Sequence, residues 1–203
     1  MLRKRVIQQA SILFSRDGIK NVSMDDLASS LRVSKRTIYQ NFENKEDVLK
    51  NCILEAQEHR AKRYTEIIHR SDNIVIRFLD ILCDYKSIKL PRDTFLEDIH
   101  IFYPNIYQTI LSESEKYRVR MKELIRAGIE EGYFRSDINP EETVWMLDMG
   151  TYIRISIAHS ENGTAIPTDL IYNMMVNILR GISTRKGLEI IDAYIPISPN
   201  LNN

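Results

Sequence analysis

Hydrophobic residues recur every three or four positions along most of this chain, which is the spacing of one face of an α-helix. Gly18 follows the first such stretch and suits a helix C-terminus. Helices are predicted for residues 6–14, 23–31, 34–42, 44–69, 74–85, 95–102, 105–131, 140–157 and 167–182. A tail follows from Lys186 and frays after Tyr194. Because no pair of alternating strand segments is visible, we predict an all-α protein of about nine helices.

The second and third predicted helices are short, and each has a clear start signal. Ser23 followed by Asp26 is an S-x-x-D capping pattern, and Ser34 is suited to cap the next helix. The turn between the two helices falls near Arg32 and Val33. Two short helices at this spacing are typical of a helix-turn-helix.

The third predicted helix has the face that a major groove requires. Ile38 and Phe42 anchor it from behind, and its other side chains are polar or basic. Arg36 and Gln40 have the chemistry to read base edges. Lys35, Tyr39 and Lys45 are better suited to phosphate oxygens, and Lys45 also lies in the first turn of the next helix. The alternative is a charged helix face that only meets solvent.

The candidate DNA-binding residues all lie in this segment. They are Ser23, Ser34, Lys35, Arg36, Thr37, Tyr39, Gln40, Asn41 and Lys45. The charge distribution agrees with this assignment, because the net charge of zero divides into +4 over residues 1–50 and −4 over residues 51–203. Such asymmetry suits one end that faces a polyanion and a body that does not.

The same segment closely resembles the DNA-binding end of the TetR family of bacterial regulators, in the residues GIKNVSMDDLASSLRVSKRTIYQNFENKEDVL. The family pattern is a Gly after helix 1, a Ser or Thr cap, and a VSKxTxYxxFxxKxxL core. This chain matches it with Gly18, Ser23, Val33, Ser34, Lys35, Thr37, Ile38, Tyr39, Phe42, Lys45 and Leu49. Arg36 stands where a small residue is frequent and Gln40 where a His is frequent, so the base preference is this protein's own.

The resemblance implies a domain organisation and a function. We expect a helix-turn-helix domain over residues 1–47, a helical regulatory and dimerisation domain over 48–195, and a tail over 196–203. The family binds palindromic operators in double-stranded DNA as dimers, usually as repressors that a small-molecule effector releases. The last two long helices are apolar enough to form the homodimer contact, and Gly150 and Gly181 would allow close approach there.

Aromatic residues of the helical body are the candidates for an effector pocket, with plain core packing as the alternative for each one. The full candidate set is Phe78, Leu82, Tyr85, Phe95, Phe102, Tyr103, Tyr107, Trp145, Met149 and Tyr152. Four carboxylates, Asp84, Glu97, Asp98 and Asp148, would favour a cation if they faced that space. Solvated surface positions are the alternative for these four.

Other classes of function lack their signals. The sequence has no phosphate-binding Gly-rich loop, no HExxH, no GxSxG and no Cys/His arrangement, so we expect no enzyme activity, metal site or cofactor. No signal peptide or membrane-spanning run is visible, so we expect a cytoplasmic protein without membrane contact. Two rivals remain: a DNA-binding regulator controlled by a protein partner, and a helical enzyme with an incidental helix-turn-helix.

Overall fold

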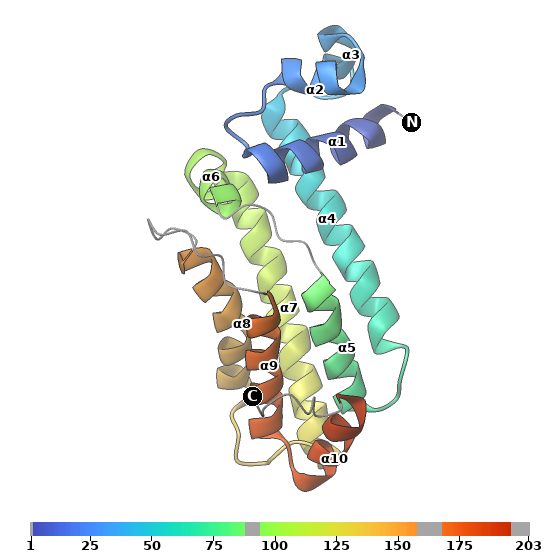
Figure 1. Ribbon diagram of the computed structural model, residues 1–203, viewed down its shortest axis with the longest axis vertical. Helices are drawn as coiled ribbons and strands as arrows, with labels where there is room; N and C mark the ends of the chain where they lie inside the picture. The colour runs from blue at the N-terminus through green and yellow to red at the C-terminus, as the bar shows by residue number, and fades with distance from the viewer. Residues whose placement is uncertain (1, 88–93, 158–167, 196–203) are drawn as a thin grey trace, which may run out of the picture. The chain divides into compact units, whose positions relative to one another are not determined.

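The computed structural model describes residues 2–87, 94–157 and 168–195, without the side chains of residues 86, 87, 94, 150–157 and 168. Ten helices occupy these ranges (Figure 1). They are α1 (Leu2–Asp17), α2 (Met24–Leu31), α3 (Lys35–Tyr39), α4 (Lys45–Ile68), α5 (Ile74–Ser87), α6 (Thr94–Phe102), α7 (Pro104–Glu130), α8 (Pro140–Ile157), α9 (Thr168–Ile182) and α10 (Arg185–Tyr194).

The predicted all-α class is confirmed, with one helix more than predicted in the described ranges. The additional helix is α10, which was assigned to the tail. Thr184 caps it by accepting a hydrogen bond from the Gly187 backbone N–H, and Ile191 is fully buried. The tail assignment was wrong because it overlooked an amphipathic pattern in which Leu188, Ile191 and Ile195 recur at helical spacing and pack against the second unit.

The chain forms two compact units. The first unit comprises Met1–Lys62 and Lys89–Ser114, and the second comprises Arg63–Ile88 and Glu115–Asn203. The long helices α4 and α7 each contribute a segment to both units. The domain boundary expected at residue 47 stays a prediction.

The first unit has its own hydrophobic cluster, drawn mainly from α1, α2, α3 and the start of α4. Phe14, Ile38 and Phe42 are almost completely buried in it. Phe95 and Ile99 of α6 join the same cluster, together with Ile106 of α7. Gly18 ends α1 with a φ of +87°, a conformation that a side chain would strain.

The second unit has a separate cluster, in which α9 packs against α5, α8 and α10 (Figure 1). Phe134 is fully buried in this cluster, with its ring edge-on to Phe78 at 6.0 Å between centroids. Gly128 of α7 makes room for this ring, because a Cβ there would lie 2.2 Å from Cδ2 of Phe134. Phe134 and Ser183 form an isolated antiparallel β-bridge.

None of the helices in the described ranges combines the length and the apolar character that crossing a membrane requires.

Candidate nucleic-acid interface and effector pocket

Helix α2 is fixed at both ends by local hydrogen bonds. Its N-cap is Ser23, whose Oγ accepts from the Asp26 backbone N–H at 3.1 Å, while Asp26 Oδ2 accepts from the Ser23 N–H at 2.8 Å. The Ser23 hydroxyl, which donates to Asp26 Oδ2 at 2.6 Å, and the Ser23 backbone N–H together hold the pKa of Asp26 below its ordinary value. At the other end Arg32 adopts a left-handed conformation, with a φ of +56°. The backbone therefore turns sharply between α2 and α3.

Helix α3 is held by one polar cap and an apolar back. The Oγ of Ser34 accepts from the Thr37 backbone N–H at 3.1 Å and lies 2.7 Å from the Thr37 hydroxyl. Ile38 is completely buried and Phe42, just beyond the helix, is 2% exposed. The opposite face is consequently turned to solvent.

The exposed face of α3 carries the side chains predicted to read bases. Arg36 and Gln40 are exposed, and within the described part of the chain their side-chain polar groups have no hydrogen-bond partner. Tyr39 is 46% exposed beside them. An Arg fork and a Gln amide on one exposed helix face are the groups that pair with guanine and adenine edges.

The two lysines predicted to contact phosphate are engaged within the first unit. Lys35 Nζ donates to Asp25 Oδ2 at 2.8 Å, and this hydrogen bond raises the pKa of Lys35. Lys45 Nζ lies 3.4 Å from the backbone oxygen of Lys20. Partial burial lowers the pKa of Lys45, and the carboxylates of Asp98 and Asp26 oppose that effect. To bind phosphate, each ammonium group must share or exchange these partners.

Arg3 supports the C-terminal end of α3, a role that the sequence did not reveal. Its Nη1 donates to the Asn41 carbonyl at 2.5 Å and its Nη2 to Asn51 Oδ1 at 2.9 Å. Its guanidinium also lies 4.5 Å from the centre of the Phe42 ring. Asn41 itself donates to the Thr37 carbonyl at 3.0 Å. No local motif signals this contact, because about forty residues separate Arg3 from its partners.

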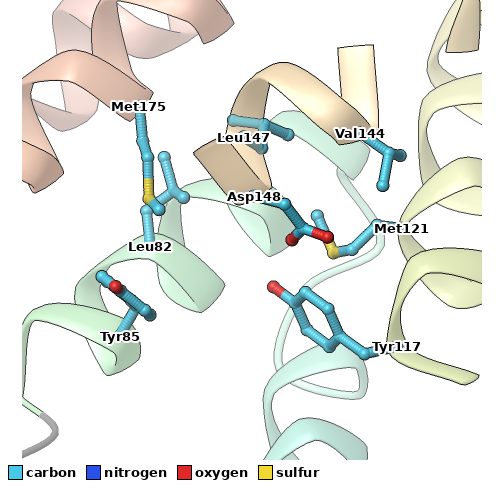
Figure 2. A pocket seen from close by; sticks show the side chains of 8 residues that line it. All are labelled: Leu82, Tyr85, Tyr117, Met121, Val144, Leu147, Asp148 and Met175. Atoms are coloured by element: carbon cyan, nitrogen blue, oxygen red, sulfur yellow. The ribbon is translucent and has the colours of Figure 1, made fainter. Parts of the chain in front are cut away.

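A pocket of about 70 Å³ lies inside the second unit (Figure 2). Helices α5, α7, α8 and α9 supply its walls. The lining residues are Leu82, Tyr85, Tyr117, Met121, Val144, Leu147, Asp148 and Met175. Apolar walls with a few polar groups are typical of small-molecule sites.

Asp148 is the single charged residue among these lining side chains. Arg118 Nη1 lies 3.5 Å from its carboxylate, and the Asp148 side chain is 20% exposed. Burial raises the pKa of Asp148, although the Arg118 charge acts in the opposite direction. The hydroxyl of Tyr117 points toward this carboxylate in Figure 2. Burial is the main cause that raises the pKa of Tyr117, and the negative charge of Asp148 adds to it.

The ten pocket candidates separate in the structure. Leu82 and Tyr85 line the pocket, and Phe78 is buried in the core of the same unit. Phe95, Phe102, Tyr103 and Tyr107 belong to the first unit, Trp145 and Met149 are about half exposed, and the side chain of Tyr152 lies outside the described residues. The sequence reading missed Tyr117, Met121, Val144, Leu147 and Met175 as lining residues. Of the four carboxylates considered for a cation, Asp148 is the one at the pocket.

The described residues contain no group of three or more His, Cys, Asp or Glu side chains arranged to hold a metal ion.

Residues 6–52 match the family model described as "Bacterial regulatory proteins, tetR family". The HTH-type transcriptional repressor KstR2 of Rhodococcus jostii is 22% identical over 156 residues, which cover 71% of this chain and 76% of KstR2. The HTH-type transcriptional regulator UidR of Escherichia coli is 30% identical over 93 residues, which cover 46% of this chain and 44% of UidR.

Solved structures of transcriptional regulators share the fold over nearly the whole chain. One from the TetR family of Cytophaga hutchinsonii has a TM-score of 0.73 at 18% identity, covering 91% of this chain and 96% of that one. A regulator from Saccharomonospora viridis, solved in complex with choline, has a TM-score of 0.78 at 20% identity, covering 91% and 98%.

Proposed function

Because the chain belongs to the TetR family and is a DNA-binding transcriptional regulator, we propose that it is a dimeric repressor released from a palindromic operator by a small molecule. The relatives named above are transcriptional regulators rather than enzymes. A bacterial regulator that acts on chromosomal DNA works in the cytoplasm, and we propose that location here.

The observation that carries the proposal is the exposed face of α3. Arg36 and Gln40 stand there with polar groups that no described residue satisfies, on a helix braced from behind by Ile38. Lys35, Tyr39 and Lys45 flank them as the proposed phosphate contacts. Arg36 and Gln40 then determine the base preference, and the flanking residues set the register on the duplex.

The proposed homodimer uses exposed apolar side chains of α8 and α9. Trp145, Met146 and Met149 of α8 are each about half exposed, and Leu170 of α9 is 59% exposed. Gly181 of α9 has open space where a Cβ would stand. Burial of such a patch against a second copy with the same surface is the usual outcome for a symmetric dimer.

The proposed effector binds in the pocket of the second unit. Its apolar walls and buried carboxylate support a small-molecule site. The Saccharomonospora viridis structure is a complex with choline, so a small molecule has been seen with this fold. Repression is supported by KstR2, which is named a transcriptional repressor.

Binding to the promoter DNA beside the protein's own gene tests the DNA contacts. We expect Arg36→Ala to weaken binding about 5- to 150-fold, the equivalent of one lost bidentate base contact, and to relax specificity at one position. Tyr39→Ala and Lys45→Ala should weaken binding to all sequences, and Lys45→Ala should lower the salt slope by about one. Arg185→Ala, on α10 of the second unit, is the matched control, because its side chain is 95% exposed. Unchanged affinity and specificity in Arg36→Ala would exclude this assignment.

A further inference from the structure

We propose that the pocket of the second unit binds the head group of an organic cation, with an alkylammonium nitrogen held by the carboxylate of Asp148. The inference rests on the proposed effector role of this pocket and adds the chemical class of the ligand. The ligand class is independent of the operator sequence and of the gene that the protein controls.

First, the carboxylate of Asp148 lies in a pocket wall that is mostly apolar. Asp148 lies on α8 directly after Leu147, and both side chains line the pocket. The walls around the carboxylate are otherwise phenol, thioether and aliphatic groups, including Tyr85 and Met175. A carboxylate in such surroundings is costly to keep charged unless a positive group pairs with it.

The second step concerns Arg118, which is the positive group beside Asp148 in the described structure. Its Nη1 is 3.5 Å from the Asp148 carboxylate, outside hydrogen-bond range for an ideal pair. The same guanidinium makes a closer ion pair with Glu115 and lies 4.9 Å from the centre of the Trp145 ring. Arg118 therefore has other partners when a ligand takes Asp148.

The third step is the sign of the local potential. The Tyr117 hydroxyl faces the Asp148 carboxylate across the pocket (Figure 2). Because Asp148 is the one charged residue among the lining side chains, an anionic head group placed beside it would be repelled. A cation would be attracted by the same carboxylate, and the Tyr117 hydroxyl adds a polar contact.

The fourth step is size. The pocket measures about 70 Å³, and a dry cavity of about 150 Å³ accommodates benzene. The space therefore suits an ammonium nitrogen with a few carbon atoms rather than a polycyclic ring system. The apolar side chains Leu82 and Val144 provide contacts for those carbons.

The test is direct binding by the full-length protein of three probes that share one chain length: n-propylammonium, propan-1-ol and propanoate. Titration calorimetry at neutral pH should show n-propylammonium binding about tenfold tighter than propan-1-ol, with propanoate the weakest. Asp148→Asn should abolish this preference and leave propan-1-ol affinity unchanged within about twofold. Glu130→Gln is the matched control, because it removes one carboxylate charge from an exposed position of α7 that does not line the pocket.

A second readout locates the binding. Trp145 is the single tryptophan of the chain, and its ring contacts Arg118. When n-propylammonium displaces Arg118 from Asp148, Trp145 fluorescence should change in the native protein and in Glu130→Gln, and should not change in Asp148→Asn. Thermal unfolding checks that each variant is folded.

A preference for n-propylammonium of at least threefold that Asp148→Asn removes supports the proposal. A smaller preference, a preference that survives Asp148→Asn, or no binding of any probe overturns it. Parallel operator-binding assays separate the two claims. Amine binding that leaves the DNA complex intact contradicts the effector role alone, whereas release by propanoate or propan-1-ol without amine preference contradicts the ligand class alone.

Discussion

The two units of this protein differ in how far apart in sequence their functional residues lie. The proposed DNA contacts of the first unit fall within residues 23–45. Hydrogen bonds between residues close in sequence hold that segment in place. The pocket of the second unit is lined by residues that extend from Leu82 to Met175 on four helices. One site is therefore local and the other is a product of long-range packing.

This difference suggests where each unit is vulnerable. In the first unit a small core holds α3 in place from behind, so loss of one large core side chain should affect the whole DNA-binding face. In the second unit the critical feature is tight packing around the fully buried ring of Phe134, which Gly128 approaches closely.

The largest effect should come from Phe14→Ala. Phe14 is completely buried in the cluster of the first unit, and a Phe→Ala change in a core costs about 3–5 kcal/mol. We expect this loss in urea unfolding, together with loss of amide protection in α1, α2 and α3 by hydrogen exchange. The amides of α5 and α9 should keep most of their protection.

Ile12→Ala is the control for this prediction, because Ile12 lies two residues away on the same helix and is 57% exposed. Its effect should stay within about 0.5 kcal/mol. Equal loss of protection in α3 and α9 after Phe14→Ala would contradict the separation of the two cores.

Gly128→Ala should give the corresponding effect in the second unit. The new methyl group would stand 2.2 Å from the fully buried ring of Phe134, and overpacking of this kind costs about 1–3 kcal/mol. Protection should fall in α5 and α9 and persist in α1. Phe134→Leu provides the check, since the cost of Gly128→Ala should be smaller in that background by a double-mutant cycle. Additive costs would show that the ring is not the obstacle.

The sequence predicts the first unit better for a physical reason. Each helix cap of the first unit joins two residues that are three positions apart, namely Ser23 with Asp26 and Ser34 with Thr37. Sequence spacing alone therefore indicates these contacts. The second unit offers no such signal for its pocket. Periodicity identified the apolar faces of α5, α8 and α9 but not which residues meet, and Tyr117 and Met121 were therefore missed.

Even in the first unit, the contacts between distant residues could not be predicted. The link from Arg3 to Asn41 and the link from Lys45 to the Lys20 carbonyl both join segments that are far apart in sequence. The sequence indicates a free basic side chain at each position. Only the folded chain shows that both side chains also hold the unit together.

The smallest effect concerns the capping box of α2. Ser23→Ala removes a side-chain acceptor from the start of this helix and should cost about 1 kcal/mol in urea unfolding. Ser29→Ala, an exposed position inside the same helix, should be neutral or slightly stabilising.

Because Ser23 lowers the pKa of Asp26, the stability that this carboxylate provides is present above its ordinary pKa of 3.8 and lost as pH falls through the lower value. The stability difference between the native protein and Asp26→Asn should therefore shrink below about pH 4. A difference that stays constant to pH 2 would show that the charge of Asp26 has no part in the cap.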